Sequence, residues 1–182
     1  MSLPPPVVCA TLGIVAGVAA VCDLRWRRVP NWISLAGFIA GLSLNVVLAG
    51  LAGARSALMG AGLALLIYLP LYLLRGVGAG DVKLMAALGA ILGPGNWITV
   101  FVLTAITGGA VAVVLIVWRG RLGRTLGNLA ILGRQLVSLR APYSANPALD
   151  VSNPRAMTLP HAAVIAVGAL EFIVSAWALR SH

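Results

Sequence analysis

Apolar segments long enough to cross a membrane recur along the whole chain. Hydrophobic residues make up 60% of its 182 positions and charged residues only 9%, and a soluble protein of this length has no core large enough to bury so much apolar surface. A bilayer with a hydrocarbon core of about 30 Å needs roughly 20 apolar residues of helix per crossing. The sequence therefore predicts an all-α, polytopic membrane protein.

Six apolar segments are separated by charged residues or by proline and glycine. We predict transmembrane helices at residues 7–22, 31–53, 56–74, 82–92, 97–118 and 157–179. The fourth is anomalous, because the residues from Asp81 to Leu92 make only about 18 Å of helix and cannot cross the bilayer alone. Either the bilayer is locally thin, or the glycine-rich stretch 76–80 dips below the membrane surface beside a hydrated cavity that holds Asp81.

The basic residues, which give a net charge of +9, orient these segments. They concentrate in the connections after the first, third and fifth segments, whereas the other connections hold only Arg55. By the positive-inside rule the basic connections face the cytoplasm and both termini lie on the periplasmic side, so Asp23 and Asp81 share the cytoplasmic side. Because the basic residues sit beside apolar runs and are not patterned with aromatic residues, we expect the lipid bilayer and not nucleic acid as a partner.

We expect one domain, residues 1–182, embedded in the membrane. Its long connection, residues 119–156, is basic, and its leucines among arginines suggest an amphipathic helix on the cytoplasmic leaflet. No charge precedes Asp23, so the positive start of a cleavable signal peptide is missing and we expect the first segment to be retained. Cys9 and Cys22 both lie in that segment, a pattern that offers no zinc site, and we predict neither a metal nor another cofactor.

Asp23 and Asp81 are two of only four acidic residues, and each stands at the end of an apolar segment. Two carboxylates at one membrane face suggest an aspartic protease, in which one activates water and the other protonates the carbonyl oxygen. Helix dipoles favour charge on Asp81, which begins a helix, and oppose it on Asp23, which ends one, so we expect Asp81 to be the base. The alternative is that Asp81 only caps its helix and Asp23 only pairs with a neighbouring arginine.

Three short motifs surround the two aspartates and open the last segment. They read DLRWRRVPN at residues 23–31, GAGDVKL at residues 78–84 and LPHAAVIA at residues 159–166. The first two resemble the two aspartate motifs of type IV prepilin (leader) peptidases, a family of GxGD-type membrane aspartic proteases. The third is similar to the Pro-Tyr-Gly-x-Ala-Ile stretch of their last helix, with His161 and Ala162 in place of tyrosine and glycine. The compact chain looks most like the short members of Flp/Tad pilus systems.

The resemblance implies that Asp23 and Asp81 are catalytic in an endopeptidase of the bacterial inner membrane. The implied substrates are prepilin or pseudopilin precursors, whose positively charged leader is removed at the cytoplasmic face by a cut after a glycine. Because the first connection is short and lacks cysteine, no N-methyltransferase activity is expected. The motif residues expected to bind substrate or to support the aspartates are Gly78, Gly80, Lys83, Arg28, Pro30, Asn31 and Pro160.

Two other functions are compatible with the same residues. A small transporter or channel would use Asp23, Asp81 and Glu171 along an ion path, although no repeated half is detectable. A non-catalytic protein of a pilus assembly would have descended from a peptidase.

Other polar residues are expected to have structural roles. We expect Lys83 to be an interfacial cation, Glu171 to make a structural polar contact and His161 to be a hydrogen-bonded interfacial histidine. Glycines expected to let helices pack closely are Gly13, Gly17, Gly37, Gly41, Gly60 and Gly62.

Overall fold

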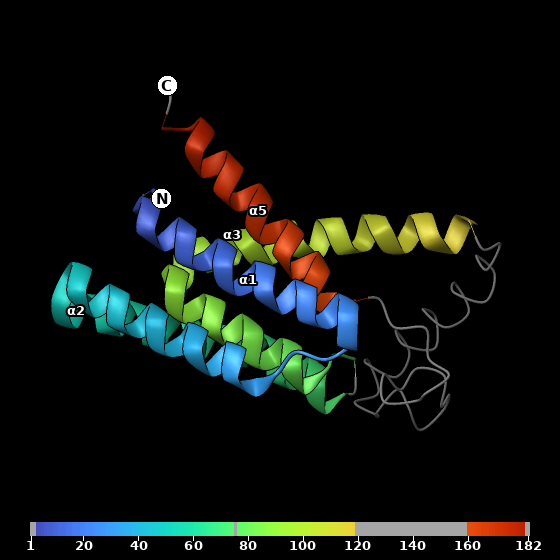
Figure 1. Cartoon of the computed structure of the whole chain (residues 1–182), viewed down its shortest axis with the longest axis horizontal. Coiled ribbons are helices and arrows are strands. Elements are labelled where there is room, and N and C mark those ends of the chain that lie inside the picture. The colour runs from blue at the N-terminus through green and yellow to red at the C-terminus, as the bar shows by residue number, and fades with distance from the viewer. Residues whose placement is uncertain (1–2, 75, 119–159, 181–182) are drawn as a thin grey trace.

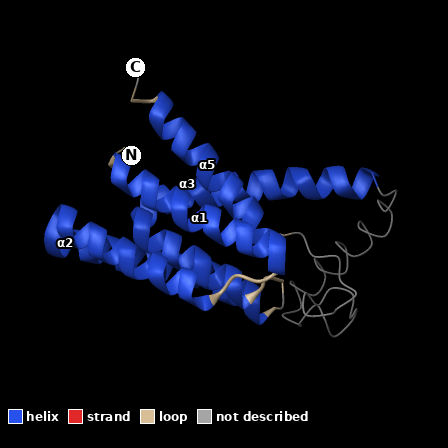
Figure 2. Cartoon of the chain, viewed as in Figure 1, coloured by secondary structure: helices blue, strands red, loops and turns tan. Residues whose placement is uncertain are grey.

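The computed structural model describes residues 3–74, 76–118 and 160–180, and its regular structure there is entirely helical (Figure 2). The helices are α1 (Pro6–Trp26), α2 (Asn31–Leu73), α3 (Ala79–Trp118) and α5 (His161–Ala178). All four are apolar and long enough to span a membrane, which agrees with the predicted helical membrane protein for the part of the chain that the structure describes. The predicted amphipathic connection, residues 119–156, lies outside the described residues.

The prediction of six separate helices is wrong, because the structure describes four. The second and third predicted segments are joined in α2, and the fourth and fifth are joined in α3. Arg55 and Pro94, which were expected in connections, therefore lie inside helices. However, α2 has 43 residues and α3 has 40, and each contains a break in its helical geometry, at Ala49 and Gly50 in α2 and at Gly93 in α3.

The break in α2 reverses the direction of the chain. A Cβ atom added to Gly41 would lie 2.6 Å from the backbone nitrogen of Ile91, and one added to Gly60 would overlap the carbonyl oxygen of Gly89. In a straight helix Gly41 and Gly60 would be about 28 Å apart, yet both contact the same two turns of α3. Gly50 makes the turn possible because its φ of 56° is open to glycine and strained for other residues.

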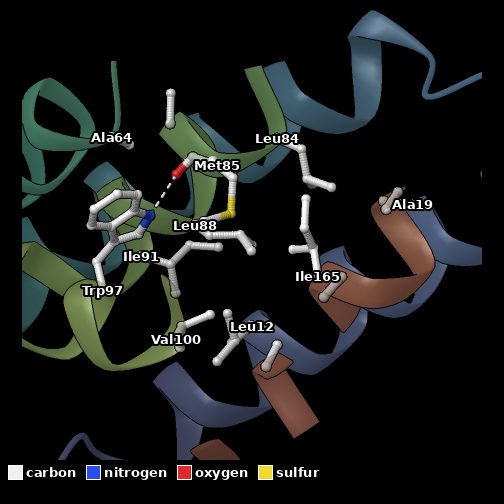
Figure 3. Packing of buried hydrophobic residues seen from close by; sticks show 14 of the residues in the cluster. Leu12, Ala19, Ala64, Leu84, Met85, Leu88, Ile91, Trp97, Val100 and Ile165 are labelled. Carbon is white, nitrogen blue, oxygen red and sulfur yellow. Dashed lines mark hydrogen bonds between the residues drawn. The ribbon is translucent and has the colours of Figure 1, made fainter. Parts of the chain in front are cut away.

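The break in α3 is a second reversal, which is visible in Figure 1. Gly93 has a φ of 70°, and Pro94 has no N–H to donate to the preceding turn. The side-chain amide of Asn45 instead donates to the carbonyl oxygens of Ala90 (2.9 Å) and Ile91 (3.1 Å). Past the turn, Trp97 Nε1 donates to the carbonyl oxygen of Met85 at 3.1 Å (Figure 3), although twelve residues of straight helix would span about 18 Å.

The first half of α3 forms the centre of the molecule. From Val82 to Gly93 every residue is buried except Lys83. Most of its side chains pack in one cluster with residues of α1, α2 and α5, including Leu12 and Ile165 (Figure 3). Ala90 packs in a second cluster with Ala57 and Ala61 of α2. The shortness of this segment follows from its position, because protein surrounds it and it does not have to match the thickness of the lipid.

The two ends of the described chain lie together. Helices α1 and α5 run side by side in opposite directions (Figure 1), and the guanidinium of Arg180 donates to the carbonyl oxygen of Pro4. At the other end of this pair, Asp23 near the end of α1 contacts Ala162 at the start of α5. The candidate site therefore lies at the end of the α1–α5 pair opposite the termini.

Candidate active site

Asp23 lies in the last turn of α1, because the helix continues past the predicted end at Cys22 and stops at Trp26. Arg27 adopts a left-handed conformation with φ 51°, and its backbone N–H donates to the carbonyl oxygen of Asp23 at 2.8 Å. The Asp23 side chain is only 9% exposed. Its Oδ2 accepts a hydrogen bond of 3.0 Å from the backbone N–H of Ala162, one of the N–H groups that the first turn of a helix leaves unpaired.

Asp81 occupies the first turn of α3 and is also held by a backbone N–H. Its Oδ2 accepts a hydrogen bond of 3.2 Å from Gly78. A Cβ atom on Gly78 would lie 3.2 Å from that same oxygen, which is tighter than an ordinary contact. The glycine at this position therefore allows the backbone to approach the carboxylate closely.

The two aspartate motifs lie against each other. The position of a Cβ atom on Gly80 is 3.4 Å from the Cβ of Val29, and Lys83 Nζ donates to Asn31 Oδ1 at 3.0 Å. Asn31 is the first residue of α2, and Pro30 precedes it in an extended conformation. Lys83 is thus more than an interfacial cation, because it joins the start of α2 to the first turns of α3.

Ionisable side chains from the other three described helices lie within electrostatic range of Asp81. The carboxylate of Asp81 interacts electrostatically with Asp23 of α1 and His161 of α5, and with Tyr68 of α2. Tyr68 is 3% exposed and packs edge-on against the ring of Trp97, 6.4 Å away. Tyr68 was not among the predicted site residues, because it lies in an apolar run that is typical of a core helix. The one feature that could have pointed to it is its hydroxyl group among leucines, since a buried tyrosine usually hydrogen-bonds to a polar partner.

The other residues singled out in the sequence have surroundings of their own. Pro160 precedes α5, and its carbonyl oxygen accepts the N–H of Ala163 at 3.1 Å. Arg28 is exposed, and no hydrogen bond to either aspartate is found for it within the described ranges. Glu171 makes the structural polar contact that was predicted, because Thr107 Oγ1 lies 2.9 Å and 3.0 Å from its two carboxylate oxygens. Within the part of the chain that the structure describes, no three His, Cys, Asp or Glu residues are grouped as metal ligands.

Both carboxylates lie at the N-terminal end of a helix. Asp81 begins α3, and the Oδ2 of Asp23 is bound at the start of α5. The dipole of α5 favours charge on Asp23, whereas the dipole of α1 opposes it. Helix dipoles alone therefore do not distinguish the two groups as strongly as the sequence suggests, and the assignment of Asp81 as the base stays a prediction.

The described residues define a class of protein: helices apolar and long enough to span a membrane, with two carboxylates, each fixed by a backbone N–H, on elements that pack together. Residues 10–113 match the model of the type IV leader peptidase family. Because this match covers more than half of the chain, the protein belongs to that family of peptidases. The matched range contains Asp23 and Asp81, whereas His161 and Glu171 lie beyond it.

Individual relatives agree with the family match. The chain is 34% identical over 128 residues to the prepilin leader peptidase/N-methyltransferase of Burkholderia pseudomallei strain 1026b, and equally to that of strain K96243. Each match covers 65% of this chain and 41% of the relative, so the chain matches about two fifths of the length of these curated proteins. No solved structure matches the chain.

Proposed function

We propose that this protein is an aspartic endopeptidase that removes the positively charged leader from prepilin or pseudopilin precursors. The observation that carries the proposal is the packing of the two aspartate motifs, which are far apart in sequence: Gly80 lies against Val29 and Lys83 bonds to Asn31. Asp23 and Asp81 are each held by a backbone hydrogen bond beside this contact. One carboxylate would activate a water molecule and the other would donate a proton to the carbonyl oxygen of the peptide bond. Fixed carboxylates suit this chemistry, because they need no reorganisation as the reaction proceeds.

The supporting residues have separate roles in this proposal. Gly78 would fix Asp81 through its N–H, and Gly80 would let Val29 approach. Lys83 and Asn31 would hold the two aspartate motifs in register through their hydrogen bond. Pro30 and Pro160 would set the directions in which α2 and α5 begin, and Arg28, which is exposed beside the site, would contact the substrate.

We propose further that the four helices make six crossings of a bacterial inner membrane as one domain. The reversals at Gly50 and Gly93 divide α2 and α3 into two segments each, and both helices are roughly twice as long as one crossing requires. An even number of crossings puts both termini on one side, in agreement with the contact between Arg180 and Pro4. The basic residues around Asp23 favour the cytoplasm for the site and the periplasm for the termini.

The finer specificity is also a proposal. We expect the cut to follow a glycine, as the resemblance to prepilin peptidases implies. Because residues 27–30, which join α1 to α2, contain no cysteine, we expect no N-methyltransferase activity, and a role in a Flp/Tad pilus system fits this compact form.

The decisive experiment is co-expression with a prepilin-like precursor, followed by measurement of leader removal. Asp23→Asn and Asp81→Asn should each abolish cleavage, because each removes a proton-transfer group while keeping the size of the side chain. Glu171→Gln is the matched control, since this acid bonds to Thr107 away from the pair, and it should retain cleavage. Immunoblots must show equal amounts of each variant in the membrane. Continued cleavage by either aspartate variant would refute the proposed pair.

A further inference from the structure

The first turn of α5 contacts both aspartates. The backbone N–H of Ala162 donates to Asp23, and the neighbouring imidazole of His161 interacts electrostatically with Asp81. One rigid turn thus carries a side chain toward one carboxylate and a backbone donor toward the other. The ionisable groups that interact with this turn are Asp23 of α1 and Asp81 of α3, and Tyr68 of α2 interacts in turn with Asp81.

His161 has an unused hydrogen-bonding group. Its Nε2 is buried and has no hydrogen-bond partner among the residues that the structure describes. This differs from the hydrogen-bonded histidine expected from the sequence. A buried polar atom without a partner costs free energy, so its presence in a native protein calls for an explanation, such as a bound water or ion or a role in catalysis.

We propose that Nε2 of His161 donates a hydrogen bond to the carbonyl oxygen of the peptide bond being cleaved, an inference that rests on the proposed peptidase function. In the imidazolium form, and in the neutral form with the proton on Nε2, this nitrogen is a donor. The carbonyl oxygen is the acceptor that an extended peptide would offer beside Asp81. Its negative charge grows as water attacks the carbonyl carbon, so a donor placed there binds the transition state more strongly than the substrate.

Three substitutions test which atom of His161 matters. The amide nitrogen of glutamine can take the position of Nε2, whereas that of asparagine reaches only the position of Nδ1. His161→Gln should keep kcat within about tenfold of the wild type, while His161→Asn and His161→Phe should lower kcat by about 100-fold to 1,000-fold, the usual loss for one such donor. KM should change much less than kcat. Equal activity of the glutamine and asparagine variants would overturn the proposal, and this comparison does not depend on the phenylalanine variant folding.

A second measurement does not rely on turnover. The chain has two histidines, so the variant His182→Gln leaves a single imidazole for ¹⁵N NMR in lipid nanodiscs. A synthetic peptide spanning the leader junction, with a difluorostatone at the cut, hydrates to a gem-diol whose two hydroxyls stand for the attacking water and the carbonyl oxygen. Its addition should shift the Nε2 resonance of His161, and an unchanged resonance with bound peptide would contradict the hydrogen bond.

The two proposals fail in different ways. Cleavage by Asp23→Asn or Asp81→Asn would remove the peptidase proposal itself. The other outcome is that both aspartate variants lose cleavage while His161→Asn and His161→Phe keep the wild-type kcat. This result would support the peptidase proposal and exclude the proposed role of His161.

Discussion

A single methyl group at Gly60 should displace the segment that carries Asp81. A Cβ atom there would overlap the carbonyl oxygen of Gly89 and lie 2.9 Å from the carbonyl carbons of Gly89 and Gly93, whereas ordinary contacts begin at 3.4 Å. These atoms belong to the backbone, so no side-chain rotation relieves the overlap. The two helices have to separate by about 0.5 Å at the carbons and by more at the oxygen.

The expected magnitude follows from two opposing effects. Overpacking at a close helix contact costs about 1–3 kcal/mol of the free energy of unfolding. Replacing glycine by alanine inside a helix returns up to about 1 kcal/mol through helix propensity. Gly62 lies two residues further along α2 and has no atom within 4 Å of an added Cβ, so Gly62→Ala receives only the favourable effect. Gly60→Ala should therefore unfold more easily than Gly62→Ala by about 1–3 kcal/mol.

Thermal unfolding in detergent measures the difference in stability, and cleavage of a prepilin-like precursor measures its functional effect. A shift of about 1 Å in a catalytic group can lower the rate by about 100-fold, so Gly60→Ala should also be the slower enzyme. Equal melting temperatures and equal cleavage rates in the two alanine variants would refute the view that the Gly60–Gly89 contact positions α3.

Two further predictions concern polar contacts that join the helices. Asn45→Leu should lower the free energy of unfolding by about 1–3 kcal/mol, because it leaves the carbonyl oxygens of Ala90 and Ile91 without their donor. A variant that unfolds in detergent at the same temperature as the wild type would contradict this prediction. Lys83→Met should slow precursor cleavage by releasing Asn31, and adding Asn31→Leu should cause little further loss, because both changes break one hydrogen bond. Fully additive losses in the double variant would show that the two residues act separately.

The sequence was sufficient for the helical class and for the apolar segments, because hydrophobic length is a local property. The break at Gly93 falls in the predicted connection between residues 92 and 97, where glycine and proline mark it. The break at Ala49 and Gly50 was missed, because it takes only two residues and neither is charged or a proline. Arg55 seemed to mark a connection, but it lies inside α2 beyond the actual turn.

The relation between the aspartates was only partly readable from the sequence. The basic residues indicated that Asp23 and Asp81 share one side of the membrane. The contact of Gly80 with Val29 depends on how helices pack, and so do the bond from Ala162 to Asp23 and the approach of Tyr68 to Asp81. Dipole reasoning from the sequence considered only the helix that contains each aspartate, whereas Asp23 is bound by the start of a different helix, α5.

Because protein encloses the first half of α3, bilayers of different thickness should affect this segment less than the outer helices. A helix that faces lipid tilts, or deforms the bilayer around it, when its apolar length and the bilayer thickness disagree. The segment that begins with Asp81 is wrapped by its neighbours almost all the way round, so hydrophobic mismatch acts on the outer helices first. Reconstitution into shorter-chain or longer-chain lipids should therefore change the tilt of the periphery while the depth of Asp81 stays tied to its protein surroundings.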